Sequence, residues 1–333
     1  MRQNNIFLML LKVFFFSSIL VATSAVRAEL KVVTTIKPLH SLIANVMDGV
    51  GEPALLIEGS TSPHSFTLKP SHAKLLEEAD IIFWVGESIE TFMERPLESI
   101  VKNAEVVEFM EVESINKLKF REESIFEDHD DHDDHDDHED HDDHEEHDDH
   151  DEHDDQNGHD DHGHAHGEFD AHIWLDPMNA KEMVHEIAHE LGDLDPANKN
   201  KYEANAQATI QALDQLINDI EKGINKDAKF VVFHDAYQYF EERFETKAAG
   251  ALTLNTDVLP GAKQIADIQD VIKDRGIKCI FSEPQFNPKI ITTIAEDMNI
   301  KTGVFDPLGA NIDSNKDLYF KLIQNLGNEL KGC

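Results

Sequence analysis

The feature that most limits the fold of this chain is a tract of histidines and acids in its middle. Between Asp128 and His166 the chain carries thirteen histidines, most of them followed by two acids, and the only apolar residue up to Gly167 is Ala165. A segment with so little apolar surface cannot offset the entropy lost on ordering, so we expect it to be disordered. The folded structure must be built from the residues on either side of the tract.

The chemistry of the tract predicts metal binding. Imidazole and carboxylate groups together bind borderline divalent cations, and His-rich tracts are typical of metal-binding segments. The alternative is an acidic disordered linker that happens to contain histidine, but disorder alone does not require this residue type. Composition does not say which metal the tract binds, or whether it is the main site or an accessory one.

The charge of the chain excludes one class of partner. The 333 residues carry a formal net charge of -38, of which 23 negative charges come from the acids between Glu127 and Glu168, leaving -15 on the rest. Nucleic-acid binding needs a basic footprint, which this balance does not provide. An acidic surface is compatible with a cationic ligand, and the length allows one large or two ordinary domains.

The N-terminus has the pattern of a cleavable signal peptide. Arg2 and Lys12 lie around an apolar run over 6–21, and small residues follow up to Val26-Arg27-Ala28, which resembles a cleavage site. The run is shorter than the ~20 residues that a membrane span needs, which argues against an uncleaved anchor. We predict cleavage after Ala28, export to the periplasm and a mature protein that begins at residue 29.

Hydrophobic patterns predict an α/β protein with two lobes. In the first lobe we expect strands at 30–35, 54–58, 81–85 and 105–108, and helices at 38–47, 72–79 and 89–100. In the second we expect strands at 230–233, 279–282 and 302–305, and helices at 236–243, 262–275 and 288–298. The predicted divisions are an N-terminal lobe over 29–177 with a disordered loop at 128–167, a helical linker over 178–226, and a C-terminal lobe over 227–333.

A long helix is predicted between the two lobes. One apolar stripe repeats at spacings of four and three residues and comprises Ala206, Ile210, Leu213, Ile217, Ile220 and Ile224. Asp195-Pro196 precedes this stripe and Gly223 lies near its end, as expected at helix boundaries.

The chain has two cysteines, Cys279 and Cys333. In an oxidising compartment an even number of cysteines favours a disulfide, which here would join the C-terminus to a predicted strand. Metal ligation by either thiol is the alternative. Cys333 is the last residue, a position that fits a covalent tie better than a ligand.

Several residues outside the tract lie where α/β proteins usually bind ligands. His234 follows the predicted strand over 230–233, and Asp306 follows the one over 302–305, so both lie at the carboxyl end of a strand. His64 stands in a polar loop, and His172 comes directly after the tract. If the fold brings them together, three neutral imidazoles with a carboxylate or water would make a tetrahedral zinc site.

At these residues the chain resembles the zinc-specific substrate-binding proteins of bacterial ABC uptake systems, the ZnuA type of metal-binding periplasmic receptors. The matching stretches run in family order across nearly the whole mature chain and are Pro63–Ser71, His172–Pro177, Val232–Tyr237, Phe281–Gln285 and Phe305–Gly309. A His-and-acid insertion just before the second histidine is also typical of the zinc members.

The resemblance implies a receptor that captures Zn²⁺ between its lobes at His64, His172 and His234. Manganese members usually have Glu at the third position, so His234 favours zinc. Asp306 matches the carboxylate of the manganese members and is the tentative fourth ligand, with water as the alternative. Glu283, at the end of a strand, is expected to orient a ligand imidazole.

The resemblance also implies a stiff linking helix, a Cys279–Cys333 disulfide, a monomer, and delivery of zinc to a cognate ABC permease in the inner membrane. No enzymatic reaction is expected. The tract is then an accessory metal reservoir or sensor. Its candidate ligands are His129, His132, His135, His138, His141, His144, His147, His150, His153, His159, His162, His164 and His166.

Two alternative functions remain. The first is a manganese-type metal receptor or adhesin. The second is a zinc protease, because the segment over 185–195 fits H-E-x-x-H-x-x-G-x-x-D, with His185, His189 and Asp195 as ligands and Glu186 as general base. The apolar residues of this segment also form a stripe typical of an ordinary buried helix, and no Met-turn of the extended protease pattern is recognisable.

Overall fold

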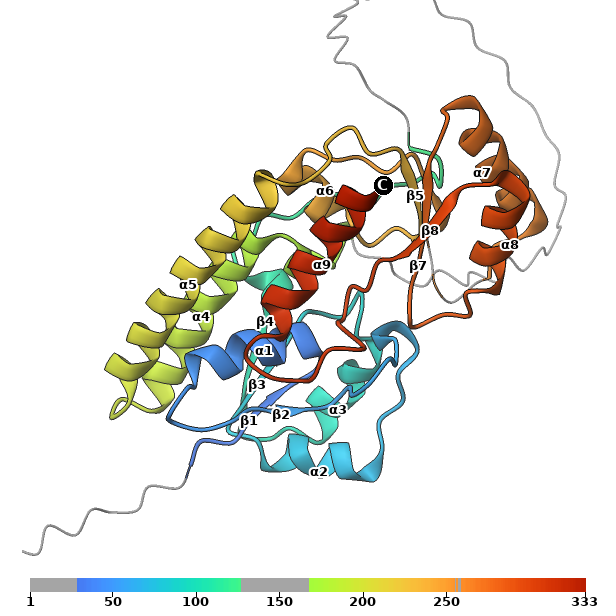
Figure 1. Cartoon of the computed structure of the whole chain (residues 1–333). Helices are drawn as coiled ribbons and strands as arrows, with labels where there is room; N and C mark the ends of the chain where they lie inside the picture. The colour runs from blue at the N-terminus through green and yellow to red at the C-terminus, as the bar shows by residue number, and fades with distance from the viewer. Residues whose placement is uncertain (1–28, 127–167, 255, 257–258) are drawn as a thin grey trace, which may run out of the picture.

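The structure is a computed structural model that describes residues 29–126, 168–254, 256 and 259–333 (Figure 1). The predicted signal peptide (1–28) and the predicted disordered loop (128–167), with all thirteen tract histidines, lie outside these residues. No helix in the described part of the chain has the length and apolar character needed to cross a membrane.

The first half of the chain forms a four-stranded parallel sheet with the order β2-β1-β3-β4. Its strands are β1 (Val32–Thr34), β2 (Ala54–Leu55), β3 (Ile81–Trp84) and β4 (Glu105–Glu108). Its helices are α1 (Lys37–Val46), α2 (Pro70–Glu78) and α3 (Glu94–Ser99). Every residue of β3 is buried, as expected for an apolar run inside a parallel sheet.

Before the second sheet begins, the chain forms two long helices that lie side by side, α4 (Pro177–Leu194) and α5 (Lys199–Glu221) (Figure 1). The carboxylate of Asp176 accepts the backbone N–H of Met178 and caps α4, which has proline at its first position. The predicted stripe provides the buried face of α5, which ends at Glu221, before Ile224. The connection is thus a pair of packed helices.

The second half forms another parallel sheet, with the order β6-β5-β7-β8. Its strands are β5 (Phe230–His234), β6 (Ala251–Thr253), β7 (Cys279–Ser282) and β8 (Lys301–Val304). Its helices are α6 (Gln238–Phe244), α7 (Ala262–Asp274) and α8 (Lys289–Met298). The edge strand β6 was not predicted, because its three residues follow Ala248-Ala249-Gly250, which has little strand propensity.

The C-terminal helix α9 (Leu318–Gly332) was also not predicted. It packs against α1 and α5 through an apolar face that includes Leu322 and Leu326. At its far end the Cys279–Cys333 disulfide joins it to β7, which confirms the predicted bridge. The helix therefore contacts the first half of the chain while its end is covalently fixed to the second sheet (Figure 1).

Short 3₁₀ helices complete the described fold. They are η1 (Pro63–Ser65), η2 (Thr91–Met93), η3 (Phe109–Glu111) and η4 (Ile173–Leu175). Two of them, η1 and η4, lie at the site described next.

Candidate metal centre

Three histidines from distant parts of the chain meet in one place. His64 lies on η1, His172 immediately precedes η4, and His234 is the last residue of β5. One ring nitrogen of each lies within 4.8 Å of the others, and no other group of three or more potential metal ligands in the described residues meets that criterion. The structure thus brings together the three histidines singled out in the sequence.

The two buried histidines of this group face each other. His172 and His234 are 4% and 3% exposed, and their Nε2 atoms lie 3.3 Å apart. Two unprotonated Nε2 lone pairs at this separation would repel each other, so a proton or a cation between them is favourable. The arrangement has the form of a site for a positively charged ligand.

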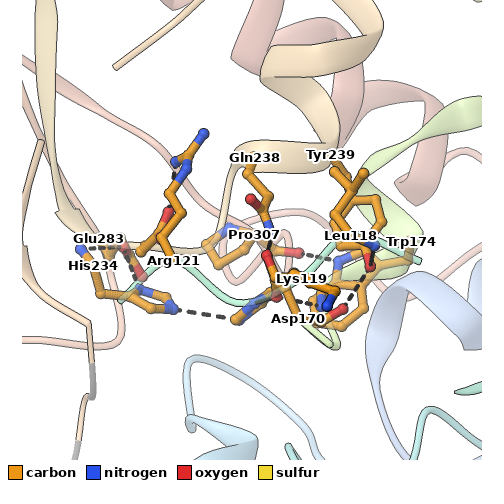
Figure 2. Close-up of polar contacts among 12 residues, drawn as sticks. Leu118, Lys119, Arg121, Asp170, Trp174, His234, Gln238, Tyr239, Glu283 and Pro307 are labelled. Carbon is orange, nitrogen blue, oxygen red and sulfur yellow. Dashed lines mark hydrogen bonds and ion pairs between the residues drawn. The ribbon is translucent and has the colours of Figure 1, made fainter. Parts of the chain in front are cut away.

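A buried carboxylate orients each of these two rings. Nδ1 of His172 donates to Asp170 at 2.6 Å, and Nδ1 of His234 donates to Glu283 at 2.6 Å. Figure 2 shows Glu283 beside His234, with Asp170 at the other side of the site. A carboxylate on Nδ1 fixes the tautomer with the Nε2 lone pair directed at the site, which is the usual arrangement around metal-bound histidine.

The expected contact of Glu283 with a histidine is confirmed, whereas Asp170 was missed. The only sequence signal for Asp170 is its place two residues before His172, on the short segment after the tract. Its carboxylate also accepts the backbone N–H of His172 at 2.9 Å, a local turn that fixes the ring and the main chain together.

The charges around His234 raise its pKa above the ordinary value for histidine. Burial alone lowers this pKa, but attraction and hydrogen bonding to Glu283, together with the charges of Asp235 and Asp170, outweigh it. The site therefore favours a positive charge on this ring, either a proton or a metal ion.

The three histidines border a cavity of about 10 Å³, which is roughly the space of one water-sized sphere. The cavity is lined by Ser62, Pro63, His64, Ile89, His172, Trp174, His234, Glu283, Gln285, Phe286, Pro307 and Leu308. A space of this size suits a single ion, and half of the residues that line it are polar.

The structure does not bring Asp306 into this group. Its Oδ1 accepts hydrogen bonds from the Gln285 side chain (3.0 Å) and from Leu308 N (3.2 Å), and its Oδ2 accepts one from Ala310 N at 2.6 Å. It is absent from the set of converging ligand atoms and from the cavity lining. The tentative fourth ligand therefore turns into its own loop, because nearby amide donors satisfy both of its oxygens.

The loop that follows β8 is held by contacts from residues that precede α4 in the chain. Trp174 Nε1 donates to Pro307 O at 2.8 Å (Figure 2), and the buried Lys37 ammonium donates to Gly309 O and Ile312 O, each at 2.6 Å. These bonds fix the wall of the cavity that Pro307 and Leu308 provide. Lys37 gave no signal in the sequence, because an isolated lysine in a helix is usually a solvated surface residue.

The protease-like pattern forms the C-terminal half of the amphipathic helix α4 and the residue that follows it. His185 and His189 are exposed on α4, and His189 contacts Glu190 and Asp193 on the same helix. Asp195 is buried at the end of α4, where it accepts hydrogen bonds from Asn198 and Tyr202. These side chains do not converge with a third ligand in the described structure.

Comparison with known proteins identifies the family. A family model described as the periplasmic zinc-uptake complex component A, ZnuA, matches residues 32–333. The chain belongs to the ZnuA family. The ZnuA family comprises substrate-binding proteins of ABC transporters, so the prediction that the chain is not an enzyme is confirmed.

Individual relatives agree with this assignment. The high-affinity zinc uptake system protein ZnuA of Brucella abortus (strain 2308) is 50% identical over 304 residues, covering 91% of each protein. The protein of the same name from Yersinia pestis is 32% identical over 319 residues and 95% of each.

Solved structures confirm the predicted fold class. A crystal structure of ZnuA has a TM-score of 0.68 at 21% identity, covering 90% of this chain and 98% of that one. The laminin-binding protein Lmb of Streptococcus agalactiae, described as having adhesin and metal-transporting activity, has a TM-score of 0.67 at 23% identity, covering 90% and 99%.

Proposed function

We propose that this ZnuA-family protein is a periplasmic receptor that captures one Zn²⁺ with His64, His172 and His234 and delivers it to an ABC permease for import. The observation that carries the proposal is the convergence of three imidazoles, two of them held by buried carboxylates. Three nitrogen ligands and an open fourth position are typical of zinc sites that exchange a ligand.

The geometry favours zinc over manganese. Imidazole suits zinc, whereas manganese prefers carboxylate, carbonyl and water oxygens. Only nitrogen atoms converge among the described residues, and Asp306 is engaged elsewhere. Water is then the expected fourth ligand. The manganese-receptor alternative predicts that Mn²⁺ displaces Zn²⁺ in direct competition.

Zinc titration of single alanine variants tests the site. We expect His64→Ala, His172→Ala and His234→Ala each to weaken the tightest binding site strongly. His185→Ala and His189→Ala are matched controls, because both histidines are exposed on α4. Loss of the tight site in these control variants, with retention in the other three, would refute the proposed ligand set.

The tract is assigned an accessory role as a reservoir or sensor. Its described flanks lie together, because Lys119 pairs with Phe169 in an antiparallel bridge, and the chain then continues directly to Asp170 and His172. A histidine-rich segment joined to the site at this point would raise the local zinc concentration.

Deletion of residues 128–166 tests the accessory role. We expect the variant to bind fewer zinc ions while keeping the tightest one, because none of the three site histidines lies in the tract. Loss of the tightest site on deletion would show that the tract supplies the main ligands.

A further inference from the structure

Helix α6 lies next to both buried histidines of the site. It begins shortly after His234, the last residue of β5, and it packs against η4, which His172 immediately precedes. His234 is held by the sheet, because β5 is paired with β6 on one side and with β7 on the other. His172 belongs to no strand, so its position depends on contacts with other elements.

The chain before His172 is held by Tyr239 of α6. The hydroxyl of Tyr239, a residue only 1% exposed, donates to Asp170 O at 2.6 Å and accepts the backbone N–H of Leu118 at 2.9 Å (Figure 2). Leu118 O in turn accepts the backbone N–H of Asp170 at 2.9 Å. Because the Asp170 carboxylate binds His172 Nδ1, these bonds fix the main chain that carries the orienting carboxylate.

The chain after His172 is held by Arg243, near the end of the same helix. Its guanidinium donates from Nε and Nη2 to the two carboxylate oxygens of Asp176, at 2.7 and 2.8 Å. Asp176 is buried and also caps α4 by accepting the backbone N–H of Met178. Two parallel hydrogen bonds from a guanidinium to a carboxylate fix direction as well as distance. The helix that follows His234 thus contacts the chain on both sides of His172.

The segment between these two contacts is short and compact. It runs from Asp170 to Asp176 and contains η4, whose three residues are all buried. Leu175 N donates to His172 O at 3.0 Å, so the histidine is attached to a tight turn. A displacement of either end would move the His172 ring relative to His234, whose Nε2 lies 3.3 Å from that of His172.

We propose that α6 sets the spacing between His172 and His234, with Tyr239 and Arg243 as positioning residues for zinc binding. The inference rests on the proposed function of the three histidines. Neither positioning side chain belongs to the converging ligand atoms, and neither lines the cavity. Both act on zinc affinity only through His172, which gives a test that a general loss of stability would not satisfy.

Zinc titrations of Arg243→Gln and Tyr239→Phe measure the effect. The emission of Trp174 is the readout, because its ring centroid lies 5.3 Å from that of His172 and it therefore reports on this site. We expect Arg243→Gln to weaken zinc binding about tenfold, the lower end of the effects typical of groups that orient ligands. Tyr239→Phe should weaken it about fivefold, as expected for the loss of one neutral hydrogen bond.

Double variants separate positioning from damage to the fold. In His172→Ala, the added change Arg243→Gln should alter zinc affinity by less than about twofold, because the ligand that Arg243 positions is gone. In His64→Ala, the same change should still weaken binding about tenfold. Equal losses in both backgrounds would overturn the proposal, since the effect would not pass through His172. If Arg243→Gln does not fold, Arg243→Lys, which keeps the charge but not the paired geometry, takes its place in the same comparison.

Two control variants match the changes on α6. Arg95→Gln removes an exposed arginine on α3, and Tyr202→Phe removes a buried hydroxyl that forms a hydrogen bond at the end of α4. Neither should change zinc affinity by more than about twofold, and losses as large as those of the α6 variants would overturn the proposal. Unchanged affinity in both α6 variants would also overturn it, while leaving the ligand set intact. If His172→Ala kept the tight zinc site, the proposed function itself would fail.

Discussion

His172 and His234 face each other with their Nε2 atoms 3.3 Å apart, although 62 positions separate them in the chain. Each ring is held from behind by a buried carboxylate at 2.6 Å, Asp170 for the first and Glu283 for the second. The ligands of the proposed zinc site are therefore positioned before an ion arrives, which reduces the entropy lost on binding.

The first prediction concerns these carboxylates. Asp170→Asn and Glu283→Gln should each lower zinc affinity about 10–100-fold, because a neutral amide oxygen accepts the Nδ1–H hydrogen bond more weakly than a charged carboxylate does. Isothermal titration at fixed pH measures the change. Glu77→Gln, on the exposed face of α2, is the control, and equal affinities in all three variants would contradict the assigned role.

The second prediction is the pH dependence of zinc binding. Because the pKa of His234 is raised, protons begin to compete with zinc at a pH above the ordinary histidine value of ~6.5, and the competition increases as pH falls. Dissociation constants measured across this range should rise as pH falls. In Glu283→Gln the midpoint of the pH dependence should move to lower pH, and an unmoved midpoint would exclude Glu283 as a main cause.

The same shift changes the stability of the zinc-free protein. A group whose folded-state pKa is raised contributes stability that is complete below its unfolded value and is lost as pH rises through the folded value. His234 should therefore stabilise the zinc-free form at low pH and the zinc-bound form at high pH. Unfolding midpoints with and without zinc, measured against pH, should diverge as pH increases.

The third prediction concerns Glu90, a fully buried acid that follows the cavity residue Ile89 in the sequence. Its Oε2 accepts the backbone N–H groups of Val85 (2.7 Å) and Gly86 (3.1 Å). Burial raises the pKa of Glu90 to about 7, although the hydrogen bonds from Gly86 and Val85 oppose the change. The folded protein consequently holds this proton more tightly than the unfolded chain does.

Stability linked to Glu90 is present below the unfolded value of 4.5 and is lost as pH rises towards 7. Glu90→Gln keeps a side-chain oxygen that accepts the backbone N–H groups, but it cannot ionise. Its free energy of unfolding should therefore exceed that of the wild type by up to about 3 kcal/mol between these limits. Urea unfolding at several pH values measures the difference. Parallel pH profiles for the two proteins would show that Glu90 does not carry the effect.

The fourth prediction concerns the Cys279–Cys333 disulfide, which closes a loop with a sequence separation of 54. Cys279→Ser/Cys333→Ser should reduce the free energy of unfolding by about 4 kcal/mol, since the unfolded chain gains loop entropy. Zinc affinity should be preserved, because Cys279 lies at the start of β7 and Glu283 comes just after its end. A loss of zinc affinity would indicate that α9 also positions the site.

Much of the fold could be predicted from local pattern. Alternating apolar runs and helical stripes located most strands and helices, because burial in a parallel sheet demands continuous apolar residues. The strand β6 and the helix α9 were not predicted, for different reasons. The first is three residues long, and the second buries its apolar face against α1 and α5, elements distant in the sequence.

The sequence by itself determined the chemistry of this protein: a histidine-rich, acidic chain of the ZnuA family, with three scattered histidines as candidate ligands and two cysteines as a candidate bridge. Only the tertiary structure decided how those groups are used. It joined His172 to Asp170 and His234 to Glu283, and it turned Asp306 away towards Gln285. Residue type fixes what a side chain can bind, but distance and competing hydrogen bonds decide what it does bind, and both arise only when remote segments pack together.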